Sequence, residues 1–256
     1  MLSILFAGVA PASVPARFGL DPREVVAQAA AEKPGWSFDW APYYWSASLS
    51  GSLAIDGQEI DLEGGGGGGL GAPALTGYLG HIEAHHGPWT YCFAPIFINA
   101  SDMAGGQPPT TDANVTIKAQ VHELFVAREF TPGWEWMVGA RYQKLETEMD
   151  LSIAGVPLSS HKSSTSWTDP IVGLRYSTSL GGDWSLHCRS DIGGFGVGSD
   201  FVWNASAVAN YKFTELFGVT LGYRALSYDF SADGPSGRTS YNLSMFGPII
   251  GVSFSF

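Results

Sequence analysis

Charged residues are scarce in this chain. Asp, Glu, Lys and Arg make up 14% of its 256 residues, whereas an ordinary soluble domain has about 25%. Basic residues are the rarer kind, with 13 Lys and Arg against 24 Asp and Glu and a net charge of −11. No Lys- or Arg-rich run occurs, which argues against nucleic-acid binding. No stretch of about 18 apolar residues occurs either, so the sequence predicts no membrane-spanning helix.

Cysteine is almost absent. The two cysteines, Cys92 and Cys188, fall on opposite faces of their predicted strands and lie far apart in the expected strand order. We therefore expect two free, small side chains rather than a disulfide.

The N-terminal segment lacks a basic residue before its apolar run. That run covers residues 2–9, small-residue sites follow at 14–16 and 27–29, and the first basic residue is Arg17. The apolar run and the small residues resemble a secretory signal peptide. We interpret residues 1–31 as a signal-like or disordered segment.

The C-terminal segment alternates between apolar residues and residues that are mostly small or polar. An apolar residue at every second position predicts a strand with one apolar face. The run ends on an aromatic residue and resembles the terminal signal that the outer-membrane assembly machinery reads in barrel proteins, with Phe254 and Phe256 as its main residues. The apolar residues of the run are Phe246, Pro248, Ile250, Val252, Phe254 and Phe256.

The chain from residue 36 to residue 256 predicts a single closed, antiparallel, up-and-down transmembrane β-barrel of about ten strands. A stretch at 53–62 predicts a small extra hairpin. If that stretch crossed the membrane the count would be twelve, and merging separate segments would give eight. The predicted strands are 36–49, 72–86, 88–100, 112–130, 133–149, 164–180, 183–197, 201–213, 216–230 and 241–256.

The connections between these strands alternate in length, as in outer-membrane barrels. Compact turns rich in Gly, Pro and Asp occur at 86–88, 131–133, 181–183 and 214–215. We predict long loops at 50–71, 101–112, 150–163 and 231–240. Aromatic residues gather near the compact turns, where an aromatic girdle would meet the lipid headgroups; they are Trp36, Trp40, Trp89, Tyr91, Trp134, Trp136, Trp184 and Tyr211.

The charged face of the strands is predicted to line the lumen, because an Arg facing lipid at the midplane costs about 2–4 kcal/mol. Charged lumen rings would select solutes in a pore; alternatively, they would form cross-strand ion pairs that fill a narrow barrel. Glu123, Leu226 and Tyr228 break the alternation, and we assign them to strand ends or bulges. The predicted lumen charges are Glu83, Lys118, Glu135, Arg141, Asp169, Arg175, His187, Arg189, Asp191, Lys212 and Arg224.

Four motifs resemble small bacterial outer-membrane β-barrel proteins, most closely a family of unestablished function. They are Trp167-Thr168-Asp169-Pro170, Gly173-Leu174-Arg175, the glycine-rich run from Asp191 to Ser199, and Gly222-Tyr223-Arg224. The resemblance covers residues 36–256 and implies no catalytic residue. One departure is the run of six glycines at 64–69, where such proteins carry an acidic, Leu-containing segment. The glycines at 193–198 precede no Lys or helix, so we expect close strand approach there rather than phosphate binding.

Two further groups of residues bear on chemistry. His81, Glu83 and His85 share one strand face and are weak metal candidates, because no cysteine or second histidine pair is spaced to complete a site. Ser159, Ser160 and His161 in a predicted loop, with Asp169 nearby, are weak candidates for a hydrolase, but no Gly-x-Ser-x-Gly motif orients a nucleophile. We expect no catalytic residue, no metal and no cofactor.

These patterns predict a non-catalytic protein of the outer membrane of a Gram-negative bacterium, either structural or a narrow passive pore for small solutes. The expected partners are outer-membrane lipid and the barrel-assembly machinery. One alternative is an interaction module whose exposed loops bind a surface partner, and a second is an outer-membrane lipid or peptide hydrolase.

Overall fold

Strands that follow one another in the chain pair side by side around almost the whole sheet. The computed structural model describes residues 35–55, 58–61, 79–105, 112–153, 156–234 and 237–256. Within those residues no helix has the length and apolarity to cross a membrane. The strands are β1 (Trp36–Trp40), β2 (Tyr43–Trp45), β3 (Ser48–Ile55), β4 (Gln58–Asp61), β5 (Ile82–His86), β6 (Trp89–Gly105), β7 (Asp112–Thr131), β8 (Trp134–Ile153), β9 (Val156–Gly181), β10 (Trp184–Gly194), β11 (Phe201–Lys212), β12 (Phe217–Gly234) and β13 (Gly237–Ser255).

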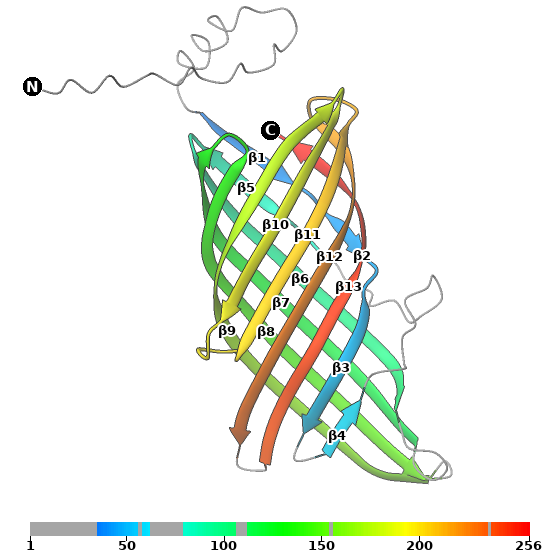
Figure 1. Cartoon of the computed structure of the whole chain (residues 1–256). Helices are drawn as coiled ribbons and strands as arrows, with labels where there is room; N and C mark the ends of the chain where they lie inside the picture. The colour runs from blue at the N-terminus through cyan, green and yellow to red at the C-terminus, as the bar shows by residue number, and fades with distance from the viewer. Residues whose placement is uncertain (1–34, 56–57, 62–78, 106–111, 154–155, 235–236) are drawn as a thin grey trace, which may run out of the picture. The chain divides into compact units, whose positions relative to one another are not determined.

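The sheet closes on itself through the first and last strands. β1 pairs with β5 on one side and with β13 on the other, and β2 and β3 continue the pairing along β13. β1, β2 and β3 therefore act as one interrupted wall strand. With β5 to β13 they make a closed, antiparallel barrel of ten wall strands. Figure 1 shows how the strands surround one interior. Pairing of β1 with both β5 and β13 removes the free sheet edges where these three strands meet.

The predicted barrel of ten strands is confirmed. Within the described residues β4 pairs with β3 alone, so it forms the small hairpin expected at 53–62 and does not cross the membrane. The predicted strand at 72–86 is described only from Leu79 onward. The glycine run at 64–69 and the signal-like segment at 1–31 lie outside the described residues.

Three of the long-loop predictions are wrong wherever their residues are described, because the strands continue into them; residues 106–111, 154–155 and 235–236 lie outside the described residues. β8 and β9 stay paired as far as Ile153 and Val156, and β12 and β13 as far as Gly234 and Gly237. Hydrophobic alternation ends where both strand faces meet water, but backbone pairing does not depend on that alternation. The affected segments are 101–112, 150–163 and 231–240.

The β10–β11 connection is the exception, because β10 ends earlier than predicted. The backbone of Gly194, Phe195 and Gly196 has positive φ angles of 85°, 52° and 73°, which end the strand in a turn. Gly193 lies close to β9, since an added Cβ would come within 2.3 Å of the carbonyl oxygen of Pro170. The close strand approach expected for this glycine-rich run is therefore present.

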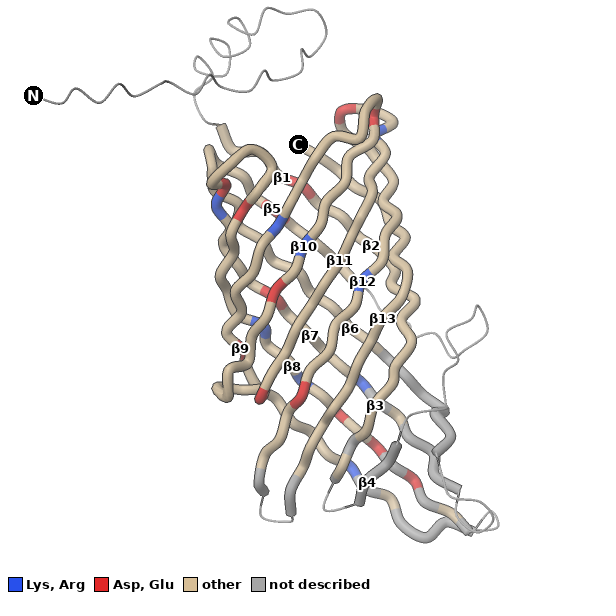
Figure 2. The backbone as a smooth tube through the Cα atoms, in the orientation of Figure 1, with Lys and Arg blue, Asp and Glu red and all other residues tan. Residues whose placement is uncertain are grey.

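The outer surface is arranged in bands. Exposed Trp and Tyr side chains lie at the short-turn end, where Trp36 contacts Tyr91 and Trp184 contacts Tyr211. Above them lies an exposed apolar band that includes Val138, Val172, Leu174, Leu221 and Ile250. Charged residues return in the far halves of β7, β8 and β9 (Figure 2). Those on the outer face include Lys118, Lys144, Glu146, Glu148, Asp150 and Lys162. This order matches a bilayer with water beyond it.

Placing an Arg in the apolar band tests that assignment. Val138 is 47% exposed and lies between Val126 and Val172 on the outer face. We expect Val138→Arg to reduce the free energy of folding into lipid vesicles by about 2–4 kcal/mol. Lys118→Gln, on the same face but beyond the band, should change it by less than about 0.5 kcal/mol. Urea titrations followed by tryptophan fluorescence measure both, and equal effects would contradict the assignment.

Candidate functional site

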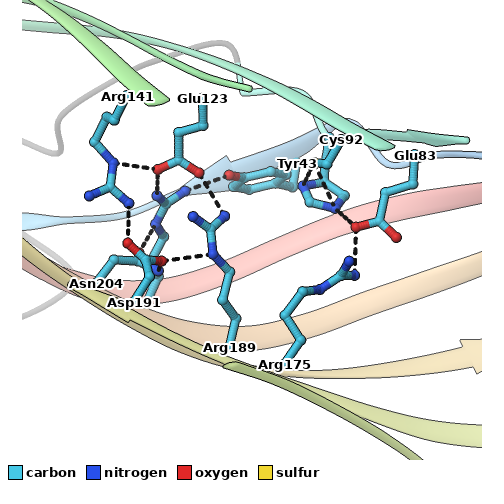
Figure 3. A network of polar contacts seen from close by, with 11 residues as sticks. Tyr43, Glu83, Cys92, Glu123, Arg141, Arg175, Arg189, Asp191 and Asn204 are labelled. Carbon is cyan, nitrogen blue, oxygen red and sulfur yellow. Dashed lines mark hydrogen bonds and ion pairs between the residues drawn. The ribbon is translucent and has the colours of Figure 1, made fainter. Parts of the chain in front are cut away.

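A buried carboxylate, that of Glu123, lies at the centre of the barrel interior. Glu123 is on β7 and is 0% exposed. Arg141 on β8 donates from Nε to Glu123 Oε1 (2.9 Å), Arg189 on β10 donates from Nη1 to Oε2 (2.7 Å), and Arg224 on β12 donates from Nη2 to Oε1 (2.8 Å). Figure 3 shows Arg141 and Arg189 reaching Glu123 from different sides. One carboxylate thus links four strands across the lumen.

A second carboxylate completes this layer. Asp191 on β10 accepts from Arg141 (2.7 Å) and Arg189 (2.8 Å), and also from the side-chain amide of Asn204 (2.8 Å). Arg224 in turn donates to Asn204 Oδ1 (2.9 Å) and to the Tyr43 hydroxyl (3.1 Å). Three guanidinium groups against two carboxylates leave a charge of +1 in this group. We call these seven residues, from Tyr43 to Arg224, the charged layer.

A third buried carboxylate, that of Asp169, binds the β10–β11 turn to strand β9. Asp169 on β9 accepts from Gln143 Nε2 (2.6 Å) and from both the backbone nitrogen (2.5 Å) and the hydroxyl (2.8 Å) of Ser199. Trp167 Nε1 donates to Ser199 Oγ at 2.8 Å. Gly198 has no room for a side chain, because a Cβ would lie 2.6 Å from Asp169 Oδ1. The turn is therefore folded inward onto Asp169.

The half of the interior toward the long strand ends is filled with apolar side chains. These residues come from β2 round to β13, and each of them is 8% exposed or less. Trp167 stacks on Phe230 with ring centroids 4.1 Å apart, and Tyr241 stacks beside them. We call this group the apolar layer: Trp45, Ala47, Leu79, Ile96, Ile98, Ala119, Val121, Leu145, Trp167, Val202, Leu226, Tyr228, Phe230, Tyr241, Leu243, Met245 and Ile249.

The half toward the short turns holds a cavity of about 420 Å³. Its wall carries many polar groups, and it reaches solvent at Lys212, which is exposed. Arg175 donates from Nη2 to Glu83 Oε1 at 2.6 Å, and its Nη1 lies 3.3 Å from Glu135. We call this the short-turn cavity; its charged and histidine lining residues are Asp39, His81, Glu83, Arg175, His187, Lys212, Arg189 and Arg224.

For two charged residues of β7, the structure differs from the prediction. Lys118 is exposed and lies on the outer face of β7, because the neighbouring Ala119 and Val121 point inward. Its predicted place in the lumen is wrong. Glu123 lies in the lumen, where no carboxylate of β7 is predicted. Its predicted place at a strand end or a bulge is wrong. The neighbouring inward residues of β7 are apolar, so the polarity pattern alone does not show that Glu123 points inward. The sequence holds one indirect indication, because three inward Arg residues require buried carboxylates as partners.

Leu226 and Tyr228 are not at bulges either. The pairing of β12 with β11 and β13 is unbroken around them, and both side chains are buried in the apolar layer. The interior changes from polar to apolar along one continuous strand face. The assignment to strand ends or bulges is therefore wrong.

The predicted metal candidates lie together, with one addition. Glu83 and His85 lie on the inward face of β5, and His81 directly precedes that strand on the same face. His85 Nε2 lies 2.9 Å from Asp39 Oδ2. The expectation that no cysteine completes the group is wrong. Cys92 lies directly across from Glu83 in the β5–β6 pairing, and its sulfur is 3.7 Å from both ring nitrogens of His81. Cys92 and Cys188 are both free, as expected.

The weak hydrolase candidates are not in a loop. Ser159, Ser160 and His161 belong to β9, the same strand as Asp169. A strand rises about 3.3 Å per residue, so His161 and Asp169 are roughly 26 Å apart along it. The Asp169 carboxylate is already bound by Gln143 and Ser199. The strand geometry does not bring this His and this Asp together.

Removing the central carboxylate tests the charged layer. Glu123→Gln leaves three buried guanidinium groups facing Asp191 alone, so we expect it to destabilise the folded barrel by about 3–5 kcal/mol. Glu148→Gln breaks a salt bridge to the exposed Lys162 and should cost less than about 1 kcal/mol. Urea unfolding in vesicles compares the two variants. A small effect at Glu123 would mean that the layer does not hold the barrel together.

Comparison with known proteins supports the fold. No family profile matches the sequence, and no curated protein matches it. Among solved structures, the outer membrane protease OmpT of Escherichia coli is similar over 86% of this chain and 96% of its own, with a TM-score of 0.52 and 10% identity. The translocator domain of the autotransporter NalP from Neisseria meningitidis matches over 91% and 93%, with a TM-score of 0.43 and 12% identity.

The likeness to OmpT concerns the fold alone at this level of identity. It adds to three observations made on the chain itself: a closed ten-stranded sheet, an exposed apolar band and aromatic residues at the short-turn end. Together they show that the chain has the fold of small bacterial outer-membrane β-barrel proteins and an outer surface suited to that membrane.

Proposed function

We propose that this protein is a sealed, non-catalytic barrel with a structural role in the outer membrane. The observation that carries the proposal is the apolar layer. Its side chains come from strands all round the wall and are almost completely buried. The charged layer lies beneath it and is itself buried at Glu123, Arg141 and Asp191. A hydrated path for ions would have to cross both layers, and apolar constrictions exclude water and ions.

A narrow passive pore is the alternative within the same class, and conductance separates the two. We expect wild-type protein in planar lipid bilayers to give no single-channel steps, with folding verified by heat-modifiable mobility on gels. Steps whose size changes when Arg189 is replaced by Gln would overturn the sealed barrel and establish a pore through the charged layer. Arg128→Gln, on the exposed outer face near the short turns, is the matched control.

Surface interaction is a second candidate, favoured by the length of β8 and β9. These strands have 20 and 26 residues, whereas about 9–11 residues cross a bilayer. Their paired far halves extend past the β10–β11 turn (Figure 1). A paired extension of this kind offers a rigid surface to a partner outside the cell. Shortening the β8–β9 hairpin beyond Glu146 and Ser164, which are paired, should leave folding intact and abolish any co-purifying partner.

Hydrolysis of lipid or peptide is the third candidate, and the site geometry lends it the least support. The separation of His161 from Asp169 along β9 leaves no Ser–His–Asp arrangement among these residues. Turnover of lipid or peptide substrates that is lost in Asp169→Asn and retained in Asp150→Asn would revive it.

The terminal aromatic residues are proposed to serve recognition by the barrel-assembly machinery and contact with lipid. Phe256 is 67% exposed, and its backbone pairs with Phe38 through two hydrogen bonds of 2.8 and 3.0 Å. Phe256→Ser keeps those backbone bonds. We expect it to lower insertion in cells several-fold while refolding into vesicles is unchanged, as followed by gel mobility. Phe213→Ser, another exposed position at the short-turn end, is the control; equal loss in both would contradict a specific signal.

A further inference from the structure

We propose that His81, Glu83 and Cys92 form a binding site for a transition-metal ion of the Zn²⁺ class at the wall of the short-turn cavity. One ligand atom from each residue lies within 4.8 Å of the other two. His81 Nε2 lies 2.7 Å from Glu83 Oε1, and Cys92 Sγ lies 3.7 Å from the His81 ring nitrogens. This site is separate from the sealing layers and from the proposed structural role.

The spacing suits tetrahedral coordination. Zn–S bonds of about 2.3 Å and Zn–N bonds of about 2.0 Å place sulfur and nitrogen roughly 3.5 Å apart at a tetrahedral centre. The S–N distance of 3.7 Å is close to that value. The Glu83 oxygen, now hydrogen-bonded to His81, would have to move back by about half an ångström to share an ion with it. Because Cys92 Sγ is equally far from both ring nitrogens of His81, the imidazole must also turn so that the lone pair of one nitrogen points at the ion.

The ligand set favours a borderline-soft ion. A thiolate with an imidazole and a carboxylate selects Zn²⁺ or a similar ion over Mg²⁺ and Ca²⁺, which prefer oxygen ligands. Cys92 is 1% exposed, and within the described chain its sulfur makes no disulfide. His81 and Glu83 line the cavity, so the fourth coordination position would face it. Three protein ligands and one open position also characterise catalytic zinc sites.

Arg175 is the cation that an incoming ion must displace. Its Nη2 lies 2.6 Å from Glu83 Oε1, and Glu135 lies 3.3 Å from its Nη1 on the other side. A metal bound to Glu83 would leave Arg175 paired with Glu135. His85 also faces this group, with Nε2 3.5 Å from Glu83 Oε2, but it is held by Asp39. Arg175 therefore competes with the metal, while His85 contributes little.

Cobalt titration tests the site directly. Full-length protein, refolded in detergent and kept reduced, is titrated with Co²⁺ and followed by thiolate-to-cobalt charge-transfer absorption. We expect one ion per chain, displaced by Zn²⁺. Cys92→Ser should abolish the band, whereas Cys188→Ser, which removes the other free cysteine, should leave it unchanged. Absence of the band in wild-type protein, or its persistence in Cys92→Ser, would overturn the proposal.

Two further variants keep the test valid if Cys92→Ser folds poorly. His81→Gln should weaken binding at least about tenfold, because loss of even an outer-shell partner costs roughly 10–100-fold in affinity. Arg175→Gln should tighten binding by removing the competing cation, a change of opposite sign that damaged folding cannot produce. Unchanged affinity in both, measured by Zn²⁺ competition, would also overturn the site. His85→Gln is the matched histidine control.

Discussion

Closure of the sheet directs every second side chain into one enclosed space. The Glu123 carboxylate stabilises the Arg side chains that are buried there. Moving an ion out of water costs several kcal/mol even in a relaxed protein, and only close partners with good geometry offset that cost. Glu123 supplies such a partner to Arg141, Arg189 and Arg224 at once. It thereby joins β7 to β10 and β12, which are not its neighbours in the sheet. The backbone ladder fixes neighbouring strands only, whereas these contacts brace opposite walls.

The sequence allows the wall of the barrel to be predicted far better than its contents. Lipid requires an apolar residue at every second position, so Val138, Val172 and Ile250 reveal their strands and their outward face. The interior imposes no such pattern, because charged and apolar side chains both belong there. On β7 the inward residues beside Glu123 are Val121 and Phe125, and polarity therefore gives the wrong face for Lys118. The cross-strand register decides which inward groups meet, and local sequence specifies that register weakly.

The same limit explains Cys92. Spacing along one strand shows that His81 and Glu83 share a face, but the cysteine comes from the neighbouring strand, and only the pairing of Glu83 with Cys92 reveals it. The far ends of β8 and β9 show the converse problem. Both faces meet water there, so the alternation fades and the segment looks like a loop although its backbone is fully paired.

Some interior residues belong to the motifs that resemble other outer-membrane barrels, and others lie outside those motifs. The motifs that resemble other outer-membrane barrels supply Trp167, Asp169, Asp191, Ser199 and Arg224, and all five belong to the apolar layer, the charged layer or the turn fastened beneath them. The resemblance therefore concerns how the barrel is filled. His81, Glu83 and Cys92 lie outside those motifs. In the sealed barrel proposed above, an ion at this site would exchange through the short-turn cavity, which reaches solvent at Lys212.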